Sequence, residues 1–168
     1  SGSDLLSGGG GDDDLRGDCG DNELVFCGDS GEAAAAAPVA GGVDTIDAGA
    51  GSDVILGGAG ADDITGGTGS DLFVYEAVGD FGDLIRDFEA GASGDKILFN
   101  GLIKLAPGAS AASYISLTQS GSDTLVWLDR DATGALSPQL VVTLKNVSTA
   151  SIASAGALCV IVRPLSEP

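Results

Sequence analysis

The chain contains no histidine among its 168 residues. This absence excludes Ser-His-Asp and Cys-His catalytic arrangements, as well as zinc sites with histidine ligands, within the chain. The chain also contains no G-x-S-x-G nucleophile elbow in a strand–helix frame. We therefore expect a protein segment without enzymatic activity of its own.

Aromatic residues, cysteines and long apolar runs are scarce. Aromatics make up 5% of the chain, although a hydrophobic content of 43% is sufficient for a core. The longest late apolar run, Ala157–Val162, is far too short to span a membrane. The three cysteines, Cys19, Cys27 and Cys159, are odd in number and match no metal-binding spacing, so we expect free, partly buried thiols.

Basic residues are almost missing from the first half. Residues 1–83 carry 18 acidic residues and one basic residue, Arg16, whereas residues 84–168 carry seven acidic and six basic residues. Phosphate binding requires Lys and Arg, so nucleic acid is not an expected partner. Carboxylates at this density repel one another unless cations neutralise them.

Glycine, in contrast, is abundant, and in residues 48–74 it recurs with a period of nine. Three consecutive units, AGAGSDVIL, GGAGADDIT and GGTGSDLFV, follow the pattern G-G-x-G-x-D-x-U-x, where U is a large apolar residue. The glycines permit a tight turn that directs carbonyl oxygens inward, and the sixth residue adds a carboxylate. The eighth residue begins a short strand that points into a core. Oxygen ligands on a flexible loop suit Ca²⁺.

The repeat extends toward the N-terminus in a second, less regular block. In residues 1–25 the sixth position holds Asp4, Asp13 and Asn22, and the frame is then lost at Phe26. The segment Glu32–Pro38 interrupts the repeats as a surface excursion, because it is too short to form a stable helix alone. The frame resumes at Val39. Such an interruption is tolerated because each coil of a repeat structure contacts only its neighbours.

The second half has the pattern of an ordinary β domain. Residues 83–97 alternate apolar and acidic positions at strand spacing, and three further strands are predicted at Tyr114–Thr118, Thr124–Leu128 and Gln139–Leu144. Residues 129–134 begin like an EF-hand loop, but Leu140 stands where the bidentate glutamate belongs. We therefore expect a long hairpin connection there.

The nonapeptide is the signature of the parallel β-roll of repeats-in-toxin proteins. From about Gly41 to Ile152 the chain resembles the C-terminal portion of large members of that family, which are exported by type I secretion. The resemblance is carried by GGTGSDLFVYE, DLIRDF…GDKILF and YISLTQSGSDTLVWLDRDATG…LVVTLKNVS. The last run resembles the type I secretion C-terminal target domain of bacterial adhesins. The resemblance implies export in an unfolded state, with an uncleaved signal near the C-terminus, and folding on extracellular calcium.

The segment from Asp83 to Ile97 resembles the D-x-I-x-D-F-x-x-G-x-D-x-I element that closes the roll in this family. Asp87 and Asp95 are two residues further apart than in that element. Two interpretations stay open at this point: metal binding by these carboxylates, and a capping hairpin whose carboxylates are solvated.

The family resemblance also implies a ligand scheme, in which each ion lies between one loop and the loop 18 residues later. Carbonyls and one aspartate from each loop provide the ligands. The implied sets are Ala40, Gly42 and Asp44 with Gly57, Ala59 and Asp62; Gly49, Gly51 and Asp53 with Gly66, Thr68 and Asp71; Gly58, Gly60 and Asp62 with Tyr75, Ala77 and Asp80; and Gly2 and Asp4 with Gly17, Cys19 and Asn22. Gly9, Gly11 and Asp13 face the broken unit at Phe26 in this scheme, which makes a weak site.

The sequence thus predicts an all-β chain: a calcium-binding β-roll over residues 1–75, interrupted around 30–40, and a sandwich-like cap and secretion target domain over residues 76–168. Ser1 enters in the middle of a repeat, so we expect a piece of a longer protein. The predicted function is that of a non-enzymatic module that binds several Ca²⁺ ions and folds outside a bacterial cell, as part of a secreted or surface protein such as an adhesin. The expected partners are the type I secretion machinery, and a second copy or a cell-surface target. The alternatives are the tail of a secreted protease, lipase or polysaccharide-modifying enzyme, and a surface-layer or self-assembly domain.

Overall fold

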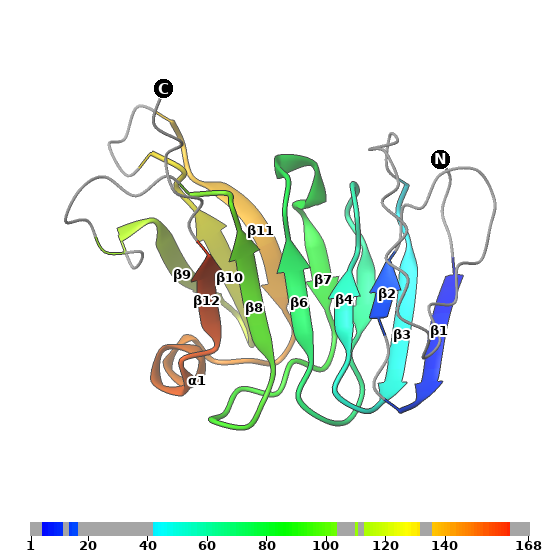
Figure 1. Cartoon of the computed structure of the whole chain (residues 1–168). Coiled ribbons are helices and arrows are strands. Elements are labelled where there is room, and N and C mark those ends of the chain that lie inside the picture. The colour runs from blue at the N-terminus through cyan, green and yellow to red at the C-terminus, as the bar shows by residue number, and fades with distance from the viewer. Residues whose placement is uncertain are drawn as a thin grey trace.

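The computed structural model describes residues 5–11, 14–16, 42–103, 110, 113–131 and 136–161. Nearly all regular structure in this part is β, arranged as two sheets (Figure 1). In spatial order, the seven-stranded sheet contains β1 (Leu5–Gly10), β3 (Thr45–Ala50), β5 (Asp63–Thr65), β7 (Asp83–Ile85), β11 (Gln139–Leu144), β10 (Asp123–Leu128) and β9 (Ile115–Ser120). The five-stranded sheet contains β12 (Leu158–Ile161), β8 (Lys96–Asn100), β6 (Leu72–Tyr75), β4 (Val54–Leu56) and β2 (Asp14–Arg16). The prediction of an all-β fold is confirmed.

In the repeat region, successive strands alternate between the two sheets, and neighbours within each sheet run parallel. One sheet grows as β1, β3, β5 and β7, and the other as β2, β4, β6 and β8. Each coil of the chain therefore adds one short strand to each sheet, which is the architecture of a parallel β-roll. Two consecutive nonapeptides make one coil.

The core between the sheets is built from the eighth residues of the repeats. Ile55, Ile64 and Phe73 are each 1% exposed, as the pattern predicts. Strand register places these residues in two rows, Leu6, Ile46, Ile64, Ile85 and Leu144 in one sheet and Leu15, Ile55, Phe73, Ile97 and Leu158 in the other. Full burial of one such side chain contributes about 1.5–3 kcal/mol. The apolar rows hold the sheets together and align the loops at their edges.

The interruption of the repeats leaves the strand ladder intact. β1 pairs directly with β3, and β2 with β4, so that Leu6 is aligned with Ile46 and Leu15 with Ile55. Residues 17–44 separate β2 from β3, whereas only residues 57–62 separate β4 from β5. The predicted repeat at 17–25 and the excursion at Glu32–Pro38 lie outside the described residues.

The second half extends both sheets. β7 and β8 form one more coil on the roll, because β7 pairs in parallel with β5 and β8 with β6. A capping hairpin over residues 83–97 is therefore wrong, since its two strands lie in different sheets. β9, β10 and β11 form an antiparallel meander that joins β7 through β11, and β12 joins β8 in parallel. The three late strands and the long hairpin connection are confirmed, while the domain division at residue 75 stays a prediction.

One short helix was not anticipated. α1 (Thr149–Ala155) begins after Ser148, whose side-chain oxygen accepts the Ser151 N–H, and ends at Gly156, which adopts the left-handed conformation. A 3₁₀ turn, η1 (Val78–Asp80), follows β6. Within the described ranges, no helix is long and apolar enough to cross a membrane.

Candidate metal sites between the loops

Two rows of buried aspartates follow the two edges of the roll. The first row is Asp44, Asp62 and Asp83, and the second is Asp53, Asp71 and Asp95. Each carboxylate is at most 3% exposed and lies two residues before an apolar core residue. Within each row, Oδ1 of one aspartate accepts the backbone N–H of the preceding one, at 2.9 Å for both steps of the first row and 3.0 Å for both steps of the second. Every loop is thus tied to the next by a carboxylate.

The loop backbones approach one another closely at glycine. Gly60 has φ +147°, and a Cβ on it would lie 1.7 Å from the carbonyl oxygen of Gly42. Gly69 has φ +138° and stands in the same relation to Gly51, with a distance of 1.6 Å. Carbonyl oxygens of one loop therefore lie against the next loop, beside the buried carboxylates. Only glycine fits where the backbone needs both a positive φ and this proximity.

We expect Gly60→Ala to destabilise the folded roll by more than about 2 kcal/mol, because the new Cβ clashes with backbone and strains φ. The measurement is the urea midpoint of the calcium-loaded protein. Gly10→Ala is the matched control, because a Cβ there meets nothing within 4 Å and φ is not in the positive region. Equal midpoints for the two variants would contradict the loop geometry.

The second carboxylate oxygens point to a bound cation. Oδ2 is buried in Asp44, Asp53, Asp62 and Asp71, and in Asp71 it accepts no hydrogen bond. A buried, negatively charged oxygen without a donor is costly unless a cation compensates it. The described residues contain no group of three or more His, Cys, Asp or Glu side chains that could hold a metal. We predict that an ion here is held by one carboxylate from each loop together with backbone carbonyls. This oxygen-only donor set fits Ca²⁺.

The electrostatics of the aspartate rows agree with this interpretation. Burial raises the pKa of Asp83 to about 8, and the neighbouring Asp62 carboxylate adds to the shift. Burial likewise raises the pKa of Asp95 to about 6, with a contribution from Asp71. The pKa of Asp71 is also raised, first by burial and then by Asp53 and Asp87. Without a cation, the folded roll disfavours the charged form of these groups.

This shift predicts how the metal-free protein responds to pH. A carboxyl group whose pKa is higher in the folded state stabilises folding below its unfolded pKa of about 4, and this contribution disappears as pH rises through the folded value. In chelator, the roll should therefore gain structure on going from pH 8 to pH 5. Circular dichroism at the two pH values measures this gain. A metal-free roll that is more structured at pH 8 than at pH 5 would contradict the assignment.

The structure brings together two of the implied loop pairs. Gly42 and Asp44 lie beside the loop of residues 57–62, and residues 49–53 lie beside residues 66–71. The latter loops also exchange backbone hydrogen bonds, from Thr68 N to the Gly49 carbonyl (2.9 Å) and from Gly51 N to the Thr68 carbonyl (3.0 Å). These are the positions from which the implied ligands come. Calcium ligation by the individual residues stays a prediction.

In the third implied pair of loops, the aspartate that contacts the preceding loop is not the one that the family resemblance implies. The loop of residues 57–62 lies beside residues 75–83, with a hydrogen bond of 3.0 Å from Gly60 N to the Gly79 carbonyl. Asp83 rather than Asp80 accepts the N–H of Asp62. Asp80 instead accepts the N–H groups of Glu76 and Ala77 within its own turn.

The first block has a different neighbour from the implied one. The Gly11 N–H donates to the Ala50 carbonyl at 2.7 Å, and a Cβ on Gly49 would lie 2.1 Å from the Gly9 oxygen. The Gly9 loop thus lies beside the loop of Asp53, whereas the broken unit at Phe26 lies outside the described residues. Asp4, Asp13, Asn22 and Ala40 lie outside the described residues.

Sequence reasoning missed the structural role of Asp83 and Asp95 because their distances from Asp62 and Asp71 are 21 and 24 residues, not 18. Asp95 is 3% exposed, so the alternative of a solvated carboxylate is wrong for this residue. Asp87 is exposed but accepts the N–H groups of Gly66 and Gly67. A usable signal was present, because every aspartate of the two rows stands two residues before a buried apolar residue. For Asp83 and Asp95 these residues are Ile85 and Ile97.

Comparison with known families agrees with this geometry. Residues 1–24 and 40–73 match the RTX calcium-binding nonapeptide repeat in four copies. The chain carries RTX repeats. RTX repeats bind calcium and are typical of secreted proteins. No match to a curated protein is found.

Solved structures provide a fold comparison for the whole RTX-containing chain. The AlgE6R2 subunit of a mannuronan C5-epimerase from Azotobacter vinelandii is similar with a TM-score of 0.55 and 24% identity, covering 98% of this chain and 92% of that one. The AlgE6R3 subunit of the same enzyme matches with a TM-score of 0.46 and 26% identity, covering 96% and 80%. The first match shows that the fold is shared with another protein.

Proposed function

We propose that this chain is a non-enzymatic module whose calcium-induced folding outside the cell supports the type I secretion and the stability of a larger bacterial protein. The observation that carries the proposal is the pair of buried aspartate rows, in which carboxylates and carbonyls of adjacent loops face one another. Bound calcium supplies positive charge and a coordination centre for these oxygens. Nothing in the aspartate rows requires a substrate.

The residues of the roll make its folding conditional. Each Oδ1 holds the preceding loop by accepting a backbone N–H, but this brings carboxylates of the same row into a buried line. The short strands bury limited apolar surface, and this must offset a conformational entropy cost of about 1–2 kcal/mol per residue. Neutralisation of the rows removes the repulsion, so the free energy of metal binding becomes free energy of folding.

A conditional fold suits directional export. Extracellular calcium modules bind with dissociation constants of about 10⁻⁴–10⁻³ M, far above the calcium concentration of the cytosol. The chain then remains unfolded inside the cell and folds on arrival outside. The adhesin-like run of residues 114–148 favours a surface adhesin as the parent protein.

The experiment that tests the proposal is a calcium titration of the full chain, followed by circular dichroism and by direct ion counting. We expect a gain of β structure and the binding of several ions, with magnesium at equal concentration as the control. A signal that does not change with calcium would overturn the proposal, and hydrolytic activity of these 168 residues would overturn its non-enzymatic part.

A second candidate is the non-catalytic tail of a secreted polysaccharide-modifying enzyme. The shared fold with a subunit of a mannuronan C5-epimerase favours it. Two of the seven basic side chains are less available to an anionic polysaccharide, because Arg86 pairs with Asp63 and Lys145 with Asp123. Titration of the calcium-loaded chain with mannuronan separates the candidates, since measurable affinity favours the enzyme tail.

A further inference from the structure

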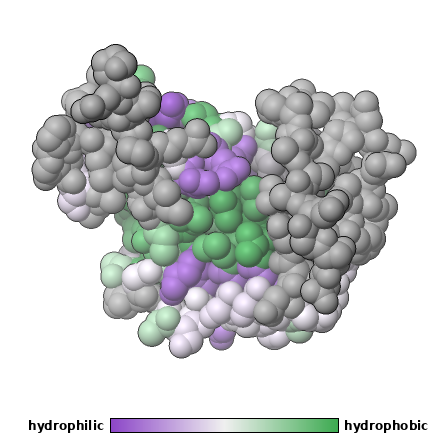
Figure 2. All heavy atoms as spheres, in the orientation of Figure 1, coloured by the Kyte–Doolittle hydropathy of each residue, from purple (hydrophilic) through white to green (hydrophobic). Residues whose placement is uncertain are grey.

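The outer faces of the two sheets differ in polarity. In each repeat the seventh and ninth residues point away from the core. On the strands β1, β3, β5 and β7 of the seven-stranded sheet, and directly after β7, they include Thr45, Asp47, Asp63, Thr65 and Arg86, with Leu5 and Leu84 as the apolar exceptions. On β4, β6, β8 and β12 of the five-stranded sheet, the outward positions hold Val54, Leu56, Leu72, Val74, Leu98 and Cys159, which we call the apolar face, together with Lys96 and Asn100 at the two ends of β8. Figure 2 shows hydrophobic surface gathered in the middle of this side of the molecule.

The apolar face is contiguous across four strands. Strand register aligns Val74, Leu98 and Cys159 in one row, and Val54, Leu72 and Lys96 in the adjacent row. Val74 is 9% exposed, and the other five are half-buried, which is typical of side chains that shield one another's flanks on a flat sheet. Among them, Cys159 is a free thiol.

Neither the core nor the metal sites account for this composition. The core is filled by the inward rows, and the aspartate rows lie at the strand ends rather than on the sheet face. A sheet with one solvated face normally carries polar residues there, as β3 and β5 of the seven-stranded sheet do. The apolar face is contiguous and partly exposed, and a patch of this kind bounded by polar groups is typical of an interaction surface.

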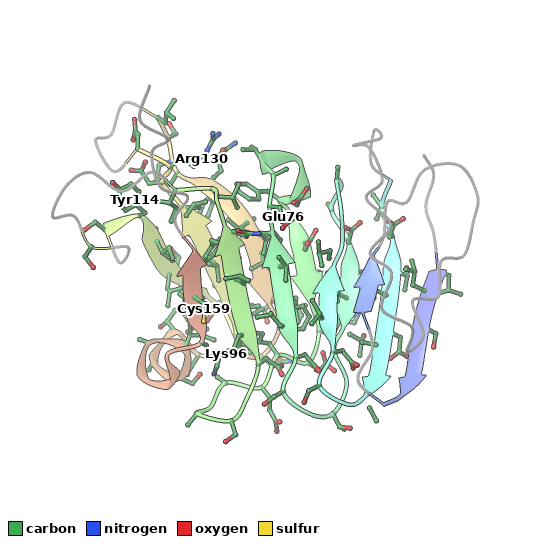
Figure 3. The ribbon with its side chains drawn as sticks, in the orientation of Figure 1. Glu76, Lys96, Tyr114, Arg130 and Cys159 are labelled. Carbon is green, nitrogen blue, oxygen red and sulfur yellow. The ribbon has the colours of Figure 1, made fainter. Side chains whose placement is uncertain are left out.

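The charges at the two ends of the apolar face indicate what it binds. Lys96 lies at the start of β8, and its Nζ donates to the Gly91 carbonyl at 3.1 Å. Glu76 lies just beyond the other end of β6, where its Oε1 accepts a hydrogen bond of 2.6 Å from Asn100 Nδ2 on β8. Figure 3 shows Glu76 toward the upper ends of the strands and Lys96 toward the lower ends, with Cys159 at an intermediate level. One end of the apolar face is basic and the other is acidic. The faces of two copies are therefore complementary in charge when their strands run in opposite directions.

We propose that the apolar face packs against the same face of a second copy of the chain. A two-fold axis perpendicular to the strands turns one copy end over end and brings its Lys96 toward Glu76 of the other. Such an isologous contact repeats every interaction twice, and two sheets stack in this way about 10 Å apart. Calcium favours the contact, because it folds the sheet and neutralises aspartates whose charge otherwise keeps two chains of net charge −18 apart. The inference thus rests on the calcium-dependent folding proposed above.

Sedimentation velocity of the calcium-loaded full chain, in a reducing buffer and at concentrations up to about 100 µM, tests the proposal. We expect a species with twice the chain mass of 16.4 kDa. Leu98→Glu places a charge at the centre of the contact and should weaken association by at least about a hundredfold. Thr65→Glu is the matched control, because it introduces the same charge at an outward position of the other sheet.

A charge exchange tests the orientation of the two copies. Lys96→Glu and Glu76→Lys should each weaken the dimer, and the double variant should restore it. Circular dichroism of every sample separates the two proposals: a chain that does not fold with calcium fails the proposed function, whereas a folded chain that stays monomeric fails this one. A folded wild-type monomer at about 100 µM overturns the proposal and implies that another segment or protein covers the face. A Leu98→Glu variant that still dimerises like the wild type also overturns it.

Discussion

Removal of calcium with excess chelator should expose the backbone amides of residues 42–74 to rapid hydrogen exchange. At a calcium concentration 100 times the dissociation constant, each site stabilises the folded state by about 2.7 kcal/mol, and several sites act on the same coils. We therefore expect protection in β3, β4, β5 and β6 to fall by at least about a hundredfold. Hydrogen exchange measured by mass spectrometry on the same sample with calcium and with chelator provides the comparison.

The β9–β10 hairpin is the internal control for this experiment. It lies at the end of the seven-stranded sheet, far along the strand order from the aspartate rows, so its protection should change least. β11 and β12 pair with β7 and β8, and we expect intermediate losses there. If residues 42–74 are already protected in chelator, calcium binds to a roll that is already folded, and the proposed calcium-induced folding is wrong.

Replacement of Asp62 by alanine should damage two neighbouring sites together. Asp62 is the middle member of its row: its Oδ1 accepts the Asp44 N–H and its own N–H donates to Asp83. The variant loses one buried carboxylate and leaves the Asp44 amide without this acceptor, which costs about 1–3 kcal/mol apart from the loss of metal ligation. We expect more than one bound ion to be lost and the calcium midpoint of folding to rise at least about tenfold, since 1.4 kcal/mol corresponds to that factor. Ion counting and circular dichroism measure the two effects.

Two further variants define what Asp62→Ala reports. Asp47→Ala removes an exposed carboxylate from the outer face of β3 and should leave both measurements nearly unchanged. Asp62→Asn keeps a hydrogen-bond acceptor but removes the charge, so it should keep more stability than the alanine variant while still weakening calcium binding. An Asp62→Ala protein with the ion number and midpoint of the parent would show that this row does not bind metal.

The repeats allowed much of the roll to be predicted from sequence because their chemistry is local. A glycine-rich turn, an aspartate and a buried Ile or Phe occur within nine residues, so one unit reveals the turn, the carboxylate and the strand. The inward direction of Ile55, Ile64 and Phe73 follows from this pattern and is confirmed. The three strands of the late meander are also confirmed. They could be predicted because each contains β-branched residues and lies between turn residues.

What sequence could not reveal depends on contacts between distant segments. The parallel pairing of β11 with β7 joins residues almost 60 positions apart, and no local pattern encodes it. The aspartate rows continue to Asp83 and Asp95 because the strands stay in register while the loops lengthen, and a fixed spacing of 18 cannot follow that. Helix α1 was missed because its seven residues, TASIASA, are too few to show a sustained 3.6-residue period, so its capping residues Ser148 and Gly156 were the main local signals.

β1 pairs directly with β3 although a 28-residue connection separates β2 from β3, and this has a consequence for how such proteins evolve and can be engineered. The coils on both sides are aligned in the same way as the coils that the six-residue loop between β4 and β5 joins, so the length of the connection is not part of the information that specifies the fold. New sequence can enter a roll at the boundary between two coils without disturbing the older coils. The same boundary provides a place to graft a foreign peptide onto this scaffold, with its two ends held by a ladder that tolerates the addition.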